Sequence, residues 1–362
     1  MHKREFLKLL GAGSVAVLVG GCDKNPPTAA ATGDFPKEFR IVGHGAWGSS
    51  RATGIMGVLQ AQGYLEEEFA NKGVKIDFKP MDKGGIGINE AIANGLVDAS
   101  CFGGFPQIIG RARGLKTRVL ASQGYHYSYF AVRKDFPGRK PEDLAGATIG
   151  VGFGGYGHLS TAIMLHEHGI GLKQVKLVNM SGTDSSAALA AGRIDGYLGD
   201  TTLFALEEQG LVRIIYATKG RQTHASGFGG LFATADFAER YPRAVHHLVR
   251  AFLKASHWAA LPENRAAYFE LQTRNSTTPL RYLERDHADR DLKEALNPVV
   301  DDYLVARYQE AVDFCLENAI IKNPIDVNAW IDRSTIRAAL TELGLLNYWT
   351  HLDAAGNPVA AV

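Results

Sequence analysis

Apolar and polar positions follow two different periods along the chain. Val74–Lys79 alternates with period two, the pattern of a half-buried strand, whereas Ile86–Asn94 and Phe105–Arg113 repeat their apolar positions at helical spacing. Strand-like and helical stretches take turns in this way over residues 39–121. Such alternation is typical of βαβ units built on a mostly parallel sheet.

The same alternation begins again after residue 146. A strand-like stretch precedes a glycine-rich turn and the helical stretch Gly157–His168, and the corner Ala191–Gly196 repeats the corner Asn94–Ala99. At each corner a glycine ends a helix, an aliphatic residue enters a strand and an aspartate follows. We therefore expect structural roles, rather than ligand contacts, for Asp98 and Asp195.

Two runs of alternating elements predict two α/β lobes. The chain is expected to pass from one lobe to the other and back again. Tyr125–Arg133 is a strand-like stretch that joins the lobes, and Gly227–Ala233 is the candidate for the return. We expect residues 37–122 and 228–362 to form lobe 1, with C-terminal helices, and residues 123–227 to form lobe 2. Two crossings make a hinge, and small ligands bind in clefts between hinged lobes.

The C-terminal part is predicted to be helical apart from one stretch of mixed charge. Arg281–Glu294 is dense in both signs and is expected to be a solvated helix or loop; a metal site of His287, Asp286 and Asp289 is the less favoured alternative. Helical periodicity appears in four stretches, Tyr241–Trp258, Glu263–Arg274, Tyr303–Ile321 and Ser334–Leu343.

The beginning of the chain predicts export. Three basic residues precede the apolar stretch Leu9–Val19, which is too short for a stable membrane span, and small residues lead into Cys22. The last feature resembles the lipobox of bacterial lipoproteins, which implies a signal peptide over residues 1–22 with lipidation of Cys22. Residues 23–36 are expected to be a flexible tether. Export by the Sec or the Tat route, and a cytosolic protein with an apolar first helix, are alternatives left open.

The composition excludes some classes of binding partner and of protein. Lys plus Arg (39) nearly equal Asp plus Glu (38), so the net charge is +1 and no basic field attracts nucleic acid. Three cysteines are too few for a disulfide framework, and nothing in the sequence supports a pairing of Cys101 with Cys315. A hydrophobic fraction of 46% in 362 residues suits a globular chain with two ordinary domains or one two-lobed unit.

Four predicted strand-to-helix turns carry glycines, and three of them also carry aromatic residues. One of them, Gly152–Gly157, has the form G-x-G-x-x-G, but no acidic residue ends the next strand as dinucleotide binding requires. We expect a small anion to bind there through backbone amides and the helix dipole, a structural tight turn being the alternative. The other three turns are Gly43–Gly48, Asp82–Ile86 and Phe102–Pro106.

Enzyme signatures are absent from the sequence. It holds no G-x-S-x-G, H-E-x-x-H or C-x-x-C motif, so we expect a binding protein without a cofactor or metal. The aromatic residues near the turns predict an organic ligand with an apolar body, although core packing is the simpler reading for most of them. A redox or sensor module that uses Cys101 is a third and less favoured class.

The chain resembles the sulfonate/nitrate/taurine-binding family of ABC importers between about Phe39 and Trp258. The resemblance rests on Gln62–Glu66, Gly95–Asp98 leading to Pro106, Glu142–Val151, Gly154–His158 and Ala191–Asp195. It implies a periplasmic-binding-protein type II fold with two mixed-sheet α/β lobes, a hinge and extra C-terminal helices. It also implies that the ligand is a small organic anion, a sulfonate first. A lipid-anchored monomer outside the cytoplasm would deliver this ligand to a permease and its ATPase.

The resemblance places ligand contacts at the turns. The expected contacts are Ala46, Trp47, Gly84, Gly85, Phe102, Gly103, Gly104, Phe105, Tyr125, Gly155, Tyr156, Gly157, His158 and Asp200. Asp200 lies in Leu198–Thr202, where the family often has a Trp-Asp-Pro-like loop. Relatives of the same fold include thiamine-pyrimidine synthases, so a pyrimidine-binding protein or a synthase-like enzyme is the alternative function.

Overall fold

The computed structural model describes residues 34–45, 51–81, 84–219, 223–274, 276 and 278–361. The predicted signal peptide, the lipidation site Cys22 and most of the tether lie outside the described residues. The same holds for two expected ligand contacts, Ala46 and Trp47.

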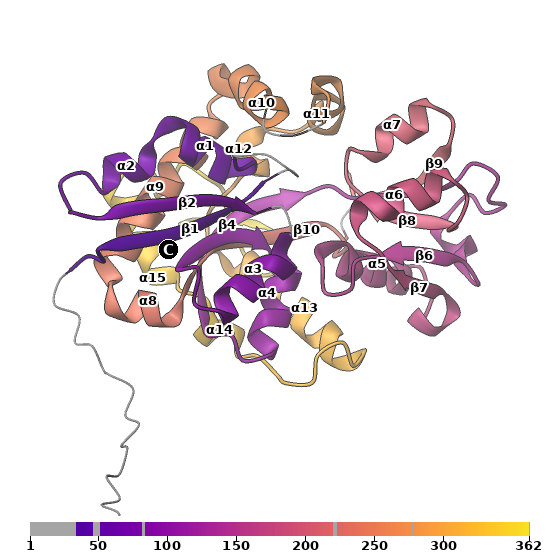
Figure 1. The fold of residues 1–362 in the computed structure, drawn as a ribbon, viewed down its shortest axis with the longest axis horizontal. Helices are drawn as coiled ribbons and strands as arrows, with labels where there is room; N and C mark the ends of the chain where they lie inside the picture. Colours follow the sequence, from indigo (N-terminus) through magenta and orange to yellow (C-terminus); the bar gives the residue numbers. More distant parts are fainter. Residues whose placement is uncertain are drawn as a thin grey trace, which may run out of the picture. The chain divides into compact units, whose positions relative to one another are not determined.

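The first sheet has five strands (Figure 1). In sheet order they are β2 (Lys75–Met81), β1 (Glu38–His44), β3 (Ala99–Gly103), β10 (Gly227–Thr234) and β4 (Thr117–His126). Strand β1 pairs in parallel with β2 and β3, whereas β10 runs antiparallel to both β3 and β4.

The second sheet repeats this arrangement. Its strands, in sheet order, are β7 (Lys176–Asn179), β6 (Thr148–Val151), β8 (Gly196–Gly199), β5 (Tyr129–Arg133) and β9 (Val212–Ala217). Strand β6 is parallel to β7 and β8, and β5 is antiparallel to β8 and β9. The predicted α/β fold with two mixed-sheet lobes is confirmed. The sheets are less parallel than the alternation suggests because β5 and β10 each enter from the other lobe.

Helices connect and cover the strands (Figure 1). The connecting helices are α1 (Gly54–Gln62), α2 (Tyr64–Glu68), α3 (Gly84–Ala93), α4 (Gly104–Ala112), α5 (Tyr156–Glu167), α6 (Gly182–Ala190) and α7 (Leu203–Glu208). The later helices are α8 (Ala235–Arg240), α9 (Pro242–Ala260), α10 (Arg265–Arg274), α11 (Leu280–His287), α12 (Leu292–Ala295), α13 (Asp302–Glu317), α14 (Val327–Trp330) and α15 (Arg333–Glu342). A short hairpin follows, formed by β11 (His351–Leu352) and β12 (Pro358–Val359).

The two repeated corners do the same structural work in each lobe. Asp98 accepts hydrogen bonds from the backbone amide (2.8 Å) and Nε (3.0 Å) of Arg40. Asp195 accepts them from the Thr148 amide (2.8 Å) and from Nε of Arg133 (2.9 Å). Each aspartate thereby fastens its corner to the beginning of the neighbouring parallel strand, which confirms the expected structural role.

The chain crosses between the sheets twice, from β4 to β5 and from β9 to β10. The stretch Tyr125–Arg133, expected as one strand, is broken at Tyr127 and Ser128. Its beginning completes β4 in the first sheet, and its end forms β5 in the second. The sequence could not show this break because apolar and aromatic residues continue across it.

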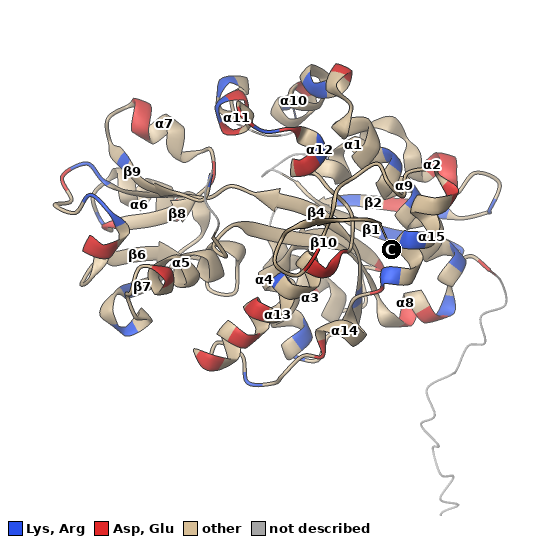
Figure 2. Ribbon diagram, turned by 180° about the vertical axis from the view of Figure 1, so that it is seen from behind, with Lys and Arg blue, Asp and Glu red and all other residues tan. Residues whose placement is uncertain are grey.

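Helix α11 corrects the expectation of a solvated segment at Arg281–Glu294. Tyr282 and Asp286, one helical turn apart, are buried. The Tyr282 hydroxyl donates to Glu208 of lobe 2 (2.6 Å), and the Arg285 guanidinium pairs with Glu207 (2.6 Å). A segment that follows the helices of lobe 1 therefore docks on lobe 2, beside α7 (Figure 1). Figure 2 shows both signs of charge interspersed over the ribbon.

The two described cysteines, Cys101 and Cys315, are buried free thiols and do not pair. Burial raises the pKa of the Cys101 thiol well above its ordinary value, so little thiolate forms at neutral pH. The environment of Cys101 therefore does not favour a redox or sensor role. Among the described residues, no helix combines the length and apolarity that a membrane span needs.

A buried carboxylate on α2 makes the stability of the fold depend on pH in the acid range. Glu68 is 7% exposed and accepts from His247 (2.8 Å), Arg250 (3.0 Å) and Lys254 of α9. Burial alone would raise the pKa of Glu68, but these donors lower it to about 2. The folded pKa thus lies below the unfolded one, and the resulting stabilisation is complete above about pH 4.5 and is lost as the pH falls toward 2.

We expect Glu68→Gln to lower the free energy of unfolding at pH 7 by about 3 kcal/mol. The difference from wild type should fall to about half at pH 3. Urea unfolding at both pH values measures it. Glu66→Gln, which removes an exposed carboxylate from the same helix, is the control and should change stability by less than about 0.5 kcal/mol. A pH-independent difference for Glu68→Gln would contradict the prediction.

Candidate functional site

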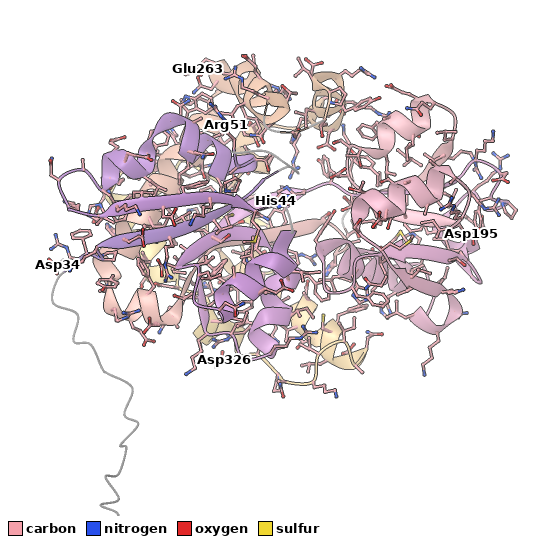
Figure 3. All side chains as sticks on the ribbon, in the orientation of Figure 1. Asp34, His44, Arg51, Asp195, Glu263 and Asp326 are labelled. Atoms are coloured by element: carbon pink, nitrogen blue, oxygen red, sulfur yellow. The ribbon has the colours of Figure 1, made fainter. Side chains whose placement is uncertain are left out.

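Several predicted ligand contacts meet where the two sheets face each other. We call this region the interlobe junction and define it by His44, Phe102–Phe105, Tyr125–Ser128, Tyr156–His158 and Asp200. These residues lie at or just after the carboxyl ends of β1, β3, β4, β6 and β8. The ends of parallel strands are where open α/β sheets bind ligands. In Figure 3, His44 is labelled between the two sheets, whereas Asp195 lies at the outer end of lobe 2.

Two helix N-termini converge at the junction. Helix α4 begins at Gly104 in lobe 1, and α5 begins at Tyr156 in lobe 2. A Cβ atom on Gly103 would lie 3.5 Å from the Cβ atom of Tyr156, and the rings of Phe105 and His158 are 5.7 Å apart between centroids. Both helices direct unsatisfied backbone amides and the positive end of their dipole toward this point. The arrangement favours an anion.

The glycine turn before α5 is partly occupied by its own chain. The Phe153 amide donates to Asn179 Oδ1 (3.0 Å), and the Gly155 amide donates to the Gly152 carbonyl (2.9 Å). In contrast, the amides of Tyr156 and Gly157 find no acceptor among the described residues. Two amides at the helix start are thus available to a ligand, fewer than a pyrophosphate cradle would offer.

Tyr156 ties the start of α5 to both chain crossings. Its hydroxyl shares a short hydrogen bond with Ser128, and a Cβ atom on Gly227 would lie 2.6 Å from its ring. Burial raises the pKa of Tyr156 well above its ordinary value, so it stays a neutral phenol. Because Gly227 has no side chain, the Tyr156 ring can pack closely against β10.

Two histidines reach the junction from lobe 1. His44 and His126 are exposed to solvent. Desolvation by the neighbouring protein atoms lowers the pKa of His44, with the charge of Asp200 opposing, and lowers the pKa of His126 to about 4. His126 is therefore neutral above about pH 5.

Some side chains of the junction, and other predicted contacts near it, pack against the rest of the protein. Phe102 packs edge-on against Phe232 in the core (4.8 Å between centroids), and a Cβ atom on Gly85 would lie 2.6 Å from Pro106. The ring of Tyr125 packs at a tilt against that of Tyr303 of α13 (5.5 Å between centroids). These residues support the turns rather than extend into the space between the lobes. Gly84, another predicted contact, is the first residue of α3.

Asp200 lies on the lobe 2 side of the junction. It is exposed and accepts a hydrogen bond from the Thr202 amide (2.9 Å). Its charge raises the pKa of both Tyr156 and Tyr197, in addition to the effect of burial. The charge of Asp200 also opposes the lowering of the pKa of His44, so Asp200 lies near residues of both lobes.

The C-terminal segment reaches this region, which the sequence did not predict. The Arg290 guanidinium donates to the Tyr125 carbonyl (2.5 Å) and lies 4.4 Å from the centroid of the Tyr127 ring. The Tyr129 hydroxyl donates to Asp286 (2.5 Å), and Asp289 pairs with Lys219 (3.5 Å). The only signal in the sequence was the density of titratable residues between 281 and 294. The acidic side chains considered for a metal site are engaged in these pairs.

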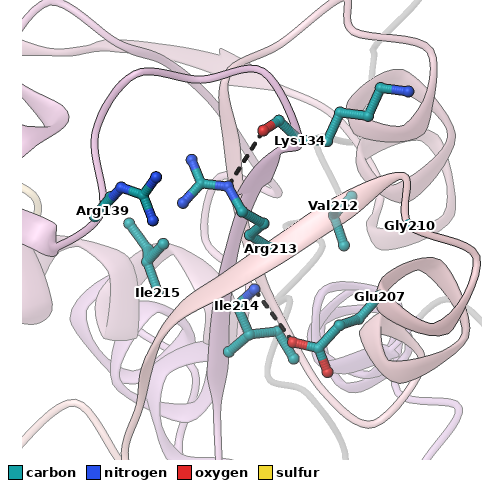
Figure 4. A pocket seen from close by; sticks show the side chains of 8 residues that line it. All are labelled: Lys134, Arg139, Glu207, Gly210, Val212, Arg213, Ile214 and Ile215. Atoms are coloured by element: carbon teal, nitrogen blue, oxygen red, sulfur yellow. Dashed lines mark hydrogen bonds between the residues drawn. The ribbon is translucent and has the colours of Figure 1, made fainter.

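A separate hollow of about 640 Å³ lies beside β9, the edge strand of the second sheet, and Figure 4 shows the side chains that line it. It is lined by Lys134, Arg139, Glu207, Gly210, Val212, Arg213, Ile214 and Ile215. The Arg213 guanidinium donates to the carbonyls of Lys134 (3.2 Å) and Phe136 (2.5 Å). Its donors are used within the loop, so this hollow is not the site that the strand ends indicate.

Comparison with known proteins agrees with this architecture. The profile of the family described as NMT1/THI5 like matches residues 53–265, more than half of the chain. The chain belongs to the NMT1/THI5-like family. The family's matched region contains both sheets except β1, both crossings and most of the interlobe junction. The resemblance to sulfonate/nitrate/taurine-type substrate-binding proteins is thereby confirmed.

Three relatives illustrate what this family member is similar to. A putative aliphatic sulfonates-binding protein of Bacillus subtilis (strain 168) is 24% identical over 337 residues, 91% of this chain and 95% of that protein. A putative periplasmic sulfonate-binding protein, SsuA, of Methylobacillus flagellatus KT has a TM-score of 0.76 at 28% identity, covering 87% and 97% of the two chains. The desulfurization enzyme DszB shares the fold alone, with a TM-score of 0.62 at 18% identity over 84% and 99%.

Proposed function

We propose that this protein is the solute-binding component of an ABC importer and that it captures a sulfonate-type organic anion at the interlobe junction. The observation that carries the proposal is the convergence of the N-termini of α4 and α5, from different lobes, at one point. Two helix dipoles and free amides there stabilise one negative charge. The similarity to sulfonate-binding proteins over nearly the whole chain supports the same ligand class.

The binding mode follows from the contacts. The amides of Tyr156 and Gly157 would hold the anionic head from lobe 2, and the start of α4 at Gly104 would hold it from lobe 1. Phe105 and His158 lie at the same point and would contact the body of the ligand. Since the contacts come from two lobes, the ligand would draw the lobes together about the two crossings.

The cellular part of the proposal rests on the beginning of the chain. Export and lipidation at Cys22 would hold the protein at the outer face of the membrane, where it would deliver the ligand to a permease as a monomer. Labelling of cells with a radioactive or clickable fatty acid tests the anchor. A labelled wild type and an unlabelled Cys22→Ala variant would support it.

Isothermal titration calorimetry tests the ligand class. The panel comprises alkanesulfonates, taurine, benzenesulfonate, the matching carboxylates, nitrate and an aminomethylpyrimidine. We expect heat with at least one sulfonate and weaker binding of the carboxylate with the same body. Binding of the pyrimidine alone would overturn the sulfonate class. Turnover of a bound compound, followed by mass spectrometry, would replace the transport function by an enzymatic one.

A further inference from the structure

The segment after α11 brings one cation to the junction. Arg290 is half-buried, and burial lowers the pKa of its guanidinium from the ordinary value. Its described partners are a carbonyl, that of Tyr125, and an aromatic ring, that of Tyr127. It forms no ion pair with any carboxylate in the described part of the chain. A desolvated guanidinium without a carboxylate in direct contact is costly, and an anionic ligand would relieve this cost.

The nearest acids are engaged elsewhere. Asp286 accepts from the Tyr129 hydroxyl (2.5 Å), and Asp289 pairs with Lys219 (3.5 Å). The remaining junction carboxylate, Asp200, accepts from the Thr202 amide on lobe 2. The charge of Asp286 acts on Arg290 without forming an ion pair with it.

The neighbouring imidazoles do not supply a positive charge. Burial is the largest cause that lowers the pKa of His126, to about 4, and that of His287, to about 3, and the charge of Arg290 adds to both. At neutral pH both histidines are therefore uncharged. Arg290 carries the permanent positive charge of this part of the junction.

The backbone that carries Arg290 is fixed from both lobes. Arg265 of α10 donates to the carbonyls of His287 (2.7 Å) and Arg290 (3.1 Å). On the other side α11 is anchored to lobe 2 through Tyr282 and Arg285. The guanidinium is thus held at a defined place beside the β4–β5 crossing rather than on a free loop.

We propose that Arg290 is a specificity-determining residue that binds the anionic group of the ligand and selects for its negative charge. This inference rests on the proposed function and adds to it a residue beyond the predicted contacts. Arginine suits the role because its planar fork can donate two parallel hydrogen bonds to a sulfonate while it keeps its contact with the Tyr125 carbonyl. The backbone amides of α4 and α5 would then orient the ligand, and Arg290 would discriminate against uncharged analogues.

The test removes the negative charge of the ligand and the positive charge of Arg290, each separately, and compares the affinities. The probes are the tightest-binding sulfonate of the calorimetric panel and the neutral sulfonamide with the same organic body. Arg290→Gln should weaken the sulfonate by roughly 10- to 100-fold and leave the sulfonamide nearly unchanged. Arg290→Lys, which keeps the charge but loses the fork, should fall between. The matched control is Arg274→Gln, which removes an exposed charge from α10 and should change neither affinity.

Each outcome decides between the two proposals. Unchanged sulfonate affinity in a folded Arg290→Gln variant would overturn the role of Arg290 and leave the proposed function standing. Equal losses for sulfonate and sulfonamide would also overturn it, because they indicate a structural role. Silence of the wild type toward every sulfonate would instead overturn the proposed function. Thermal unfolding of each variant establishes whether it is folded. If Arg290→Gln does not fold, the affinities of Arg290→Lys are compared with those of the wild type instead.

Discussion

Gly124→Ala is expected to lower the free energy of unfolding by at least about 4 kcal/mol. Gly124 is buried in β4 with φ +81, a conformation that residues with a side chain rarely adopt. A methyl group there would overlap the carbonyl oxygen of Ala295, at the end of α12. Because the added methyl group is fixed to the backbone of β4 and would meet backbone atoms of Ala295 and Leu296, no side-chain rotation can relieve the overlap.

The matched control for Gly124→Ala is Gly114→Ala. Gly114 also has a positive φ, +95, but an added Cβ atom would meet nothing within 4 Å. This change should therefore cost only the conformational strain, about 1 kcal/mol. Denaturant unfolding of both variants separates the overlap from the strain. Equal losses would show that β4 and α12 can move apart, contrary to the close packing described here.

Gln107→Leu is expected to cost about 4 kcal/mol, because three buried polar groups lose their partner at once. The Gln107 amide donates to the carbonyls of Phe102 and Gly230, each at 2.8 Å, and its oxygen accepts from the Tyr308 hydroxyl (2.6 Å). A leucine of similar volume satisfies none of them. The bonded groups belong to β3, β10 and α13, so the loss also loosens the turn before α4.

Unfolding of Gln107→Leu should be compared with Gln309→Leu, which changes a more exposed glutamine on α13. That control should stay within about 0.5 kcal/mol of wild type. Because the turn at Phe102–Phe105 carries the start of α4, we also expect weaker ligand binding by Gln107→Leu at temperatures where it is folded. Wild-type stability for this variant would mean that water or a rearranged Tyr308 replaces the lost hydrogen bonds.

Local patterns were reliable where one physical cause determined the structure. The period-two stretch Val74–Lys79 is β2 within one or two residues, and the helical stretch Phe105–Arg113 is α4. The echo between the corners at Asp98 and Asp195 correctly indicated equivalent structural roles, because both need a glycine-ended helix and an acid facing the next strand. The glycine turns at Phe102–Pro106 and Gly152–Gly157 likewise lie between a strand and a helix, as the local sequence predicted.

The two α/β lobes, the turns that precede α4 and α5 and the family can all be recognised in the amino-acid sequence, because they depend on periodicity and on glycines placed at short range. Three further features became visible in the folded chain alone: α4 and α5 meet at their N-termini, α11 docks on lobe 2, and Arg290 lies beside Tyr125, 165 positions earlier in the chain. Contacts of that kind depend on how distant surfaces fit together. No local pattern around residue 290 could distinguish a solvated charge from a desolvated one.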